Sequence, residues 1–472
     1  MVSIFEAIDR EVNKSLKFWG QLDEIYTQDI RQNKIREASL QFLMPNGVFK
    51  TRNAILTKTK MYISKKEGKD AKKMAVVIWK KLEPFCEESE SEERFGFRLI
   101  QSGLFQDFYT KSPEELEEWL ESLSRVSILN DLEEDYKTIR EIGSGSYAKV
   151  LLVQDLQDNQ EYAVKSINKD LIWNSSRNTN ALINEINVMR KLNHPFLVKL
   201  HRVYENEKFV HLILDYVPGG DLFHRLMERN VFTEEVASKF MKNMLEVLDY
   251  IHSLDIIHRD LKPENILMMN NINDWEFKIA DFGLACETHE EVMLRCGSPG
   301  YVAPEILKKH LYGKKVDIFS AGIILYVILS SRAPFFGKNS SEILIRNKEC
   351  KIYFQDRYWK NVSKEGIDCV LKLTDCDPDT RPMALEALRH PWFTITHNSK
   401  LHIESVIPPS SPDTGISAEL MKRMNNKRYV EITEKERREE EENKKAFNAH
   451  KAVMSSNAKN LLKKLRDADS LL

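Results

Sequence analysis

The chain has 472 residues, a length that predicts two to four domains, each large enough to bury its own core. Its 70 basic and 72 acidic side chains give a formal net charge of -2, so nucleic acid is not an expected partner. Acidic residues follow Met1 too soon for a signal peptide, and the longest apolar run, Ala321–Leu329, is much shorter than the roughly 20 residues of a membrane span. We therefore predict a cytoplasmic protein in which this run forms a buried helix.

The cysteines are spread along the chain and form no CxxC pair. This spacing favours free thiols in a reducing compartment over a disulfide framework. The residues concerned are Cys86, Cys286, Cys296, Cys350, Cys369 and Cys376.

Residues 1–36 are charged with scattered large apolar side chains, which predicts an N-terminal helical segment. From 37 to 126 the pattern changes to short β-type runs, and a helix follows them. In that helix Ser112 is the expected N-cap, Pro113 takes the first helical position and Glu115 completes a capping box. The β-type runs are Ala54–Thr57, Met61–Ser64, Ala75–Trp79 and Phe95–Ile100, and the apolar stripe of the helix is Leu116, Trp119, Leu120 and Leu123.

Several strands followed by one amphipathic helix with a central tryptophan resemble a pleckstrin-homology (PH) domain. The resemblance implies a β-barrel or sandwich with a C-terminal helix over residues 37–126. Lys50 and Arg52 resemble the basic-x-Arg pattern that grips inositol phosphates in lipid-binding members, so a phosphoinositide membrane surface is a candidate partner, with recruitment to the membrane as its consequence. The lysine expected on the first strand is absent from residues 37–49, which leaves protein binding open as the alternative.

The largest block, residues 136–393, begins with the glycine-rich segment Ile142–Val150. Gly143 and Gly145 let backbone N–H groups approach phosphate oxygens with no Cβ in the way. Ala148 stands where a third glycine is usual, so the segment alone is weak evidence for phosphate binding.

A lysine ends the next apolar strand, Tyr162–Lys165. Such a lysine is often a solvated strand end, but it can clamp phosphates when an acid holds it. Glu185, in the helical segment Leu182–Ile186, is the natural partner.

Three short motifs then follow in order, in Ile257–Leu267, Ala280–Gly283 and Ala303–Glu305. The first holds an acid, a cation and a metal-capable amide in a short loop between apolar anchors. They resemble the HRDxxxxN, DFG and APE elements of protein kinases, at family spacing. The resemblance covers residues 136–393 and implies the bilobal protein-kinase fold, so the whole chain is expected to be an α+β multidomain protein.

The family resemblance also implies roles for single residues. Asp260 would orient and deprotonate a substrate hydroxyl, and Lys262 would neutralise charge on the γ-phosphoryl group. Asn265 and Asp281 would hold Mg²⁺ between the phosphates of ATP. The implied ATP site comprises Ile142, Gly143, Ser144, Gly145, Ser146, Tyr147, Ala148, Lys149, Val150, Lys165, Glu185, Asp215, Val217 and Leu267.

Other matches to the family are structural. Asp317 resembles the buried acid that braces the catalytic loop, and Arg381 is expected to pair with Glu305. A stacked apolar spine is expected from Met189, Leu200, His258 and Phe282. Every catalytic position is filled, which favours an active enzyme over the alternative of a PH-anchored scaffold with a catalytically weak kinase fold.

Lys262 and the segment Gly297–Glu305 resemble those of Ser/Thr kinases rather than tyrosine kinases. The motifs Ala333–Gly337 and His390–Phe393 are similar to those of the calcium/calmodulin-dependent (CAMK) group. A PH domain before a kinase also resembles Akt-type AGC kinases, but no C-terminal aromatic hydrophobic motif follows Phe393. The CAMK-like interpretation is therefore favoured.

Residues 394–472 are highly charged and predict a regulatory tail, partly helical or disordered. They contain no DxDxDG-type calcium loop, so calcium control would need separate calmodulin. Two basic amphipathic stretches, Leu420–Met424 and Phe447–Leu465, are candidates for calmodulin or autoinhibitory binding, and a solvated helix is the alternative.

Two features concern control and substrate choice. Leu294 stands where many kinases are phosphorylated, so Arg259 would lack its usual phosphate partner and catalysis is expected to need no phosphorylation there. Asp221 matches the acid that binds a basic residue three positions before the phosphoacceptor, and Glu264 would assist it. The second acid expected nearby aligns with Val327. The sequence thus predicts a preference for Arg-x-x-Ser/Thr.

Overall fold

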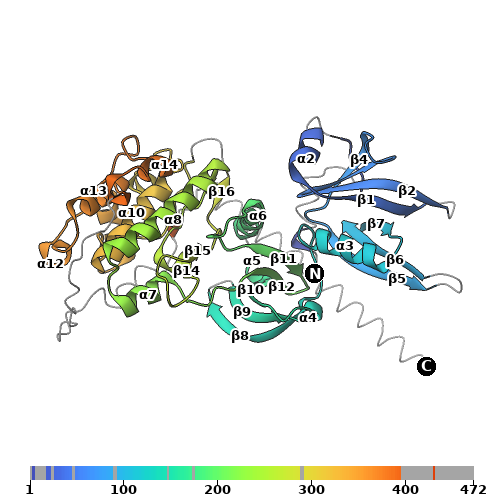
Figure 1. Cartoon of the computed structure of the whole chain (residues 1–472), viewed down its shortest axis with the longest axis horizontal. Helices are drawn as coiled ribbons and strands as arrows, with labels where there is room; N and C mark the ends of the chain where they lie inside the picture. Colours follow the sequence, from blue (N-terminus) through green and yellow to red (C-terminus); the bar gives the residue numbers. More distant parts are fainter. Residues whose placement is uncertain are drawn as a thin grey trace, which may run out of the picture. The chain divides into compact units, whose positions relative to one another are not determined.

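The structure is a computed structural model that describes residues 3–5, 18–22, 26–44, 48–88, 93–101, 103–145, 148–172, 176–287, 292–394 and 429–430. Their contacts divide them into two compact units (Figure 1). One holds the described residues up to Thr179 together with Leu200–Tyr216. The other holds Asn180–Lys199 and the described residues from Val217 onward.

The first unit begins with a seven-stranded antiparallel sheet in the order β4-β3-β2-β1-β7-β6-β5. The strands are β1 (Lys34–Leu43), β2 (Phe49–Thr57), β3 (Lys60–Ser64), β4 (Ala71–Val76), β5 (Lys81–Glu88), β6 (Glu93–Gln101) and β7 (Leu104–Tyr109). The expected strand Ala75–Trp79 therefore ends earlier, at Val76, and β1 begins before residue 37. Helix α2 (Tyr26–Asn33) lies in the expected N-terminal helical segment, whose residues 6–17 are outside the described part.

Helix α3 (Pro113–Ser124) follows this sheet and supplies its apolar stripe to the core. Trp119 and Leu123 are fully buried, and Trp119 packs against Phe97, with ring centroids 5.9 Å apart. The Ser112 hydroxyl accepts the Glu115 backbone N–H as expected of an N-cap. The Glu115 carboxylate, however, accepts the N–H of Lys111 rather than that of the cap, so the expected reciprocal capping box is not formed.

A second sheet in the same unit has the order β11-β12-β10-β9-β8. Its strands are β8 (Tyr136–Ser144), β9 (Ala148–Asp155), β10 (Glu161–Asn168), β11 (Leu200–Glu205) and β12 (Phe209–Asp215), with the short helices α4 (Leu132–Asp135) and α5 (Lys169–Ile172) beside them in the chain. The consecutive residues Ala163 and Val164 of β10 are both buried, so both faces of this central strand are covered.

A short N-terminal segment, Ser3–Phe5, is buried and contacts β11 and the turn between β4 and β5. The Glu205 carboxylate accepts the Ser3 hydroxyl at 2.5 Å and the Ile4 N–H at 2.7 Å. The same carboxylate pairs with Lys169 at 2.9 Å, and both of these side chains are almost wholly buried. Phe5 stacks on Trp79 with ring planes 7° apart.

The second unit is mainly helical. Its longer helices are α6 (Ser176–Lys191, from Asn180 on), α7 (Leu222–Arg229), α8 (Glu234–Ser253), α10 (Lys315–Ser330), α11 (Ser340–Glu349) and α13 (Lys364–Leu373). Its short elements are β13 (Ile256–Ile257), η1 (Pro263–Asn265), β14 (Ile266–Met268), β15 (Phe277–Ile279), β16 (Cys286–Glu287), β17 (Cys296–Gly297), α9 (Pro304–Leu307), α12 (Asp356–Trp359), α14 (Ala384–Ala387), η2 (Pro391–Phe393) and β18 (Tyr429–Val430).

Helix α10 contains the apolar run and is buried from Val316 to Ser330, as predicted. The helix has buried residues on all of its sides and no polar face, which is typical of a helix at the centre of a domain. Among the described residues, no helix is both long and apolar enough to cross a bilayer.

Candidate active site

The loop between β13 and β14 brings the predicted catalytic side chains together. The Asp260 carboxylate accepts the Ser298 hydroxyl at 2.6 Å and the Lys262 ammonium at 3.2 Å. The same ammonium donates to the Ser298 hydroxyl at 2.9 Å. Asn265 donates to the backbone carbonyl of Asp260 at 2.7 Å. These bonds hold a carboxylate, an ammonium and an amide in one fixed group.

A buried carboxylate braces this loop from below. Asp317 is fully buried and accepts the backbone N–H groups of His258 and Arg259 at 2.8 and 2.9 Å. Its third bond is to the His252 ring, at 2.9 Å. Burial acts to raise the pKa of Asp317, but the bonds and charge of His252 and His258 outweigh it and hold that pKa below its usual value. The expected bracing role is confirmed by these contacts.

The chain around the loop adopts backbone conformations that residues other than glycine rarely use. Arg259 and Asp281 have φ angles of 64° and 62°. Such conformations cost energy and are concentrated at functional sites, where the surrounding structure holds them in place. Phe282, next to Asp281, is fully buried against the His258 ring, with centroids 4.9 Å apart. Two members of the expected spine are thus in contact.

The donor set of Asn265 and Asp281 fits Mg²⁺. Magnesium prefers hard oxygen ligands and is usually bound by one or two protein groups together with substrate phosphates. The Asn265 amide nitrogen is turned toward Asp260, so its oxygen is the atom left to ligate a cation. Among the described residues no cluster of three or more acidic, histidine or cysteine side chains could hold a metal.

The other predicted ATP-binding residues lie in both units. In the first, Gly143 lies at the end of β8 opposite Val150 of β9, and the Gly145 N–H donates to the Ala148 carbonyl at 2.8 Å. Lys165 lies on the central strand β10. The Asp215 carboxylate, at the end of β12, bonds the His201 ring at 2.7 Å. Ser146 and Tyr147 are outside the described residues. In the second unit Glu185 lies on α6, Val217 precedes α7 and Leu267 lies on β14.

Two acids form the predicted substrate-recognition site. Asp221 caps α7 and accepts the His224 N–H at 2.8 Å. Both oxygens of Glu264 are buried and have no hydrogen-bond partner within the described part of the chain. Burial, reinforced by the charges of Asp221 and Asp260 and opposed by Lys262, raises the pKa of Glu264 to about 7. A buried carboxyl without a partner is costly, which is typical of a group that awaits a ligand.

Arg259 is bonded by uncharged groups at the place where other kinases have a phosphate. Its guanidinium donates to the Leu284 carbonyl at 2.7 Å and to the Tyr312 hydroxyl at 3.2 Å. The Tyr312 hydroxyl in turn donates to the carbonyl of Leu294, the residue at the usual phosphorylation position. Burial raises the pKa of the nearby Cys286 thiol to about 11, so that thiol stays neutral at pH 7.

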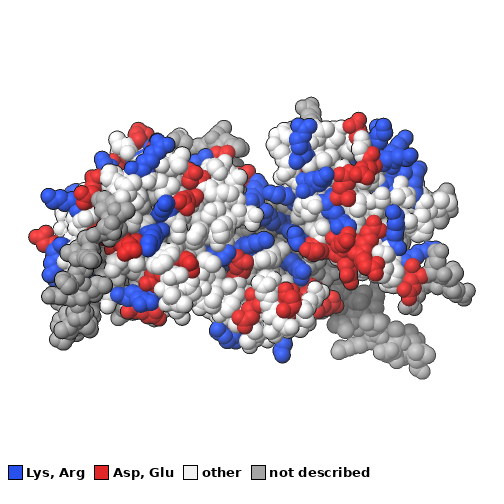
Figure 2. Space-filling view, in the orientation of Figure 1, with Lys and Arg blue, Asp and Glu red and all other residues white. Residues whose placement is uncertain are grey.

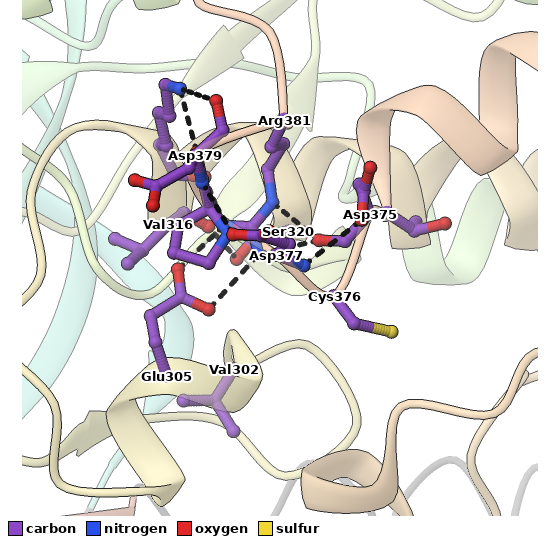
Figure 3. Close-up of polar contacts among 12 residues, drawn as sticks. Val302, Glu305, Val316, Ser320, Asp375, Cys376, Asp377, Asp379 and Arg381 are labelled. Carbon is purple, nitrogen blue, oxygen red and sulfur yellow. Dashed lines mark hydrogen bonds and ion pairs between the residues drawn. The ribbon is translucent and has the colours of Figure 1, made fainter.

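The ion pair expected between Arg381 and Glu305 is also present. Arg381, fully buried, bonds both oxygens of Glu305 at 2.7 and 3.1 Å (Figure 3). It also donates to the backbone carbonyls of Lys315 and Asp375. Because every donor contact is charge-assisted or buried, this arginine fixes the segment that ends at Glu305.

Comparison with known proteins agrees with this site. A family model described as the protein kinase domain matches residues 136–393, and the chain belongs to the protein kinase family. The probable serine/threonine-protein kinase 2 of Plasmodium falciparum is 39% identical over 297 residues, which are 62% of this chain and 57% of that protein. The calcium/calmodulin-dependent protein kinase type 1 of Caenorhabditis elegans is 38% identical over 255 residues, 54% of this chain and 72% of that protein. Myosin light chain kinase A of Dictyostelium discoideum is 35% identical over 280 residues, 59% of this chain and 94% of that protein.

The chain is therefore an ATP-dependent protein serine/threonine kinase of CAMK type, and its family uses ATP with Mg²⁺. Sequence reasoning missed two partners in the site. The sequence does contain a feature that points to Ser298, because this residue lies in the motif Gly297–Gly300, which has a glycine at each end. No sequence feature points to Tyr312, because only the fold brings its hydroxyl to Arg259.

Proposed function

We propose that this kinase phosphorylates Ser or Thr three residues after a basic residue. The observation that carries the proposal is the buried carboxyl of Glu264, which lies near the charge of Asp221 and has no hydrogen-bond partner among the residues that the structure describes. An arginine of a bound peptide would supply the missing donors, because its guanidinium forms paired bonds with carboxylates. Val327 is buried in α10, so the two acids Asp221 and Glu264 make up the proposed site.

The substitution Asp221→Asn tests this preference. Asparagine caps helices as well as aspartate does, so α7 keeps its cap while the charge is lost. We expect the KM for an Arg-x-x-Ser peptide to rise roughly tenfold, as one lost charge-assisted bond predicts, with an unchanged KM for ATP. The matched control is the same peptide with Arg replaced by Ala, whose KM should not respond to the substitution. Equal KM changes for both peptides would refute the proposal.

In the proposed reaction Asp260 accepts the proton of the substrate hydroxyl while Lys262 lies beside the transferred phosphoryl group. Their contacts with Ser298 support this assignment, since they fix both side chains before substrate binds. Asn265 and Asp281 would hold the Mg²⁺ that accompanies ATP. Loss of phosphoryl transfer in an Asp260→Ala variant that still binds ATP is the direct test, and retained transfer would exclude Asp260 as the base.

We further propose that activity needs no phosphorylation of the segment around Leu294, the position at which many kinases are phosphorylated. The bonds from Arg259 through Tyr312 to Leu294 support this, because they satisfy the arginine without a phosphate. A phosphate on Ser298 would not activate, since it would lie against the Asp260 carboxylate. Thr288 is outside the described residues.

For residues 394–472 we propose an inhibitory role. Strand β18 of the tail pairs with β17, with Val430 opposite Cys296, and this pairing supports the role. The residue after β17 is Ser298, which bonds the catalytic carboxylate. A tail strand at this place would compete with a substrate peptide. The two stretches proposed for calmodulin, Leu420–Met424 and Phe447–Leu465, lie outside the described residues.

For residues 37–126 we propose a PH-like domain that brings a cytoplasmic kinase to phosphoinositide membranes. The seven-stranded sheet followed by α3 supports the proposed PH-like fold. Exposed basic side chains around the β3–β4 hairpin support the proposed binding to membranes (Figure 2). Lys50 is exposed at the start of β2, and Arg52 donates to the Thr51 carbonyl. Phosphoinositide vesicles should retain the protein, and Arg52→Ala should release it; binding that ignores Arg52→Ala would leave protein binding as the role of this domain.

A further inference from the structure

Two cysteines that were expected to be free thiols form a disulfide. Cys350 and Cys376 are bonded although 26 residues separate them, so the expectation was wrong for this pair. The sequence spacing gave no sign of it because the fold brings the end of α11 to the loop after α13. The other four cysteines are free thiols.

The first partner ends a helix that holds the segment after Ser298, the residue that bonds the Asp260 carboxylate. Cys350 is the C-cap of α11, and its N–H donates to the carbonyls of the last turn. In that turn lies Asn347, which is fully buried. Its side chain accepts the Gly300 N–H at 2.9 Å and donates to the Val302 carbonyl at 2.8 Å. Helix α11 is thus tied to the segment that follows Ser298.

The second partner lies in the loop that holds the other end of the same segment. Cys376 follows Asp375, whose carbonyl accepts two bonds from Arg381, at 2.9 and 2.8 Å. Arg381 carries the ion pair with Glu305, and Figure 3 shows this chain of contacts from the loop to that glutamate. The disulfide therefore joins the two anchors of the segment Gly300–Glu305.

We propose that Cys350 and Cys376 form a reversible thiol–disulfide switch that controls peptide binding by the segment Gly300–Glu305. Disulfides in the cytoplasm are generally transient and redox-sensing, so a pair at this position is suited to regulation. Cys376 is exposed and Cys350 is buried, so an oxidant reaches Cys376 first and Cys350 completes the bond.

In the proposed switch a peroxide is the oxidant, and the disulfide forms in two steps. The Cys376 thiolate attacks one peroxide oxygen, the O–O bond breaks, and a sulfenic acid and water form after proton uptake. The Cys350 thiol then attacks the sulfenic sulfur, the S–O bond breaks, and water leaves as the disulfide forms. Two thiols lose two electrons to one peroxide. A dithiol reverses the change by exchange, through a mixed disulfide.

The linked state should favour peptide binding. With the bond closed, α11 and the loop at Asp375 cannot separate, so Asn347 and Arg381 hold the segment in one arrangement. With the bond open, each anchor moves independently, and the segment must be ordered when the peptide binds. ATP contacts neither anchor in the proposed site, so its affinity should stay the same.

The test compares the full chain treated with hydrogen peroxide with the chain reduced by dithiothreitol. Peptide mapping without reduction should show a Cys350–Cys376 linked peptide only after oxidation. The peptide KM should be roughly fivefold or more lower in the oxidised form, with little change in kcat or in the KM for ATP. The disulfide is detected by peptide mapping, without any assay of activity. The proposal rests on the proposed Arg-x-x-Ser preference only for the choice of peptide, so failure of the switch and failure of that preference can be told apart.

Matched variants separate the switch from general oxidation. Cys376→Ser should fix the high KM under both conditions, while Cys86→Ser, which removes an exposed thiol of the first unit, should leave the response intact. Cys350→Ser should behave as Cys376→Ser, and thermal unfolding would show that each variant is folded. A peptide map without the linked peptide, a KM equal in both forms, or a response that persists in Cys376→Ser would each overturn the proposal.

Discussion

If Glu264 binds the arginine of a substrate peptide, as we propose, recognition of that peptide should depend on pH. Its pKa is raised to about 7 by burial, so near pH 6 the carboxyl is mostly neutral and near pH 8 it is mostly charged. The KM for an Arg-x-x-Ser peptide should therefore fall by roughly an order of magnitude from pH 6 to pH 8. Glu264→Gln should flatten this dependence, and a profile with the same slope in both proteins would count against Glu264 as the arginine ligand.

Stability should change in the opposite direction with pH. The folded pKa of Glu264 lies above the unfolded value of 4.5, so the folded state binds the proton more tightly. The stabilisation that results is complete below pH 4.5 and is lost as pH rises through about 7. Glu264→Gln removes this loss, so its melting temperature should exceed that of the unmodified chain at pH 8 but not at pH 5.

Tyr312 is the residue through which the unphosphorylated segment is held. Tyr312→Phe removes the hydroxyl that joins Arg259 to the Leu294 carbonyl, so the guanidinium and the carbonyl each lose one hydrogen bond. The cost of about 1–3 kcal/mol should lower kcat/KM of bacterially made, phosphate-free protein by about tenfold. Tyr353→Phe, at an exposed position, is the control and should change nothing. Full activity of Tyr312→Phe would mean that another contact orders the segment.

For single residues, the family resemblance predicted the contacts between residues of known motifs. It did not predict contacts between residues outside those motifs, which only the fold brings together. The pairs of Asp317 with the catalytic loop and of Arg381 with Glu305 were both predicted. The bond from Tyr312 and the link between Cys350 and Cys376 were not, because neither pair has a spacing along the chain that indicates contact.

Among the elements, β11 depends on a buried ion pair for its contact with the segment Ser3–Phe5. Glu205→Ala would leave the Lys169 ammonium buried without its carboxylate and should destabilise the first unit by about 3–5 kcal/mol. It would also release the bonds of Ser3 and Ile4, so a protease should cut near them faster. Chemical unfolding measures the first effect and timed proteolysis the second.

A double variant separates the ion pair from the shape of the site. Lys169→Met with Glu205→Leu removes both charges and keeps apolar volume, so it should recover most of the stability that Glu205→Ala loses. If Ser3–Phe5 stays protected in this variant, then the stacking of Phe5 on Trp79 holds the segment without the ion pair. If Glu205→Ala itself costs nothing measurable, the buried pair does not support this unit.

The sequence predicted the position of an element where a single feature, such as an apolar run or a helix cap, was clear. The apolar run predicted α10, and Ser112 with Pro113 predicted the start of α3. The end of β4 at Val76 was missed, because Val77, Ile78 and Trp79 are buried like strand residues but form a turn. Burial without a partner strand looks the same in sequence as burial within a sheet.

For the whole molecule, the proposed inhibition by the tail predicts that the peptide KM depends on whether β18 is present. If β18 occupies the place of a substrate peptide at β17, a chain that ends at Phe393 should have a peptide KM roughly fivefold or more below that of the full chain. A chain that ends at Lys435 keeps Tyr429–Val430 and is the matched control, so it should stay inhibited. Steady-state assays with saturating ATP compare the three proteins. Equal KM values in all three would show that the pairing does not inhibit, whereas release in both shortened chains would place the inhibitory segment after Lys435, in the stretch Phe447–Leu465.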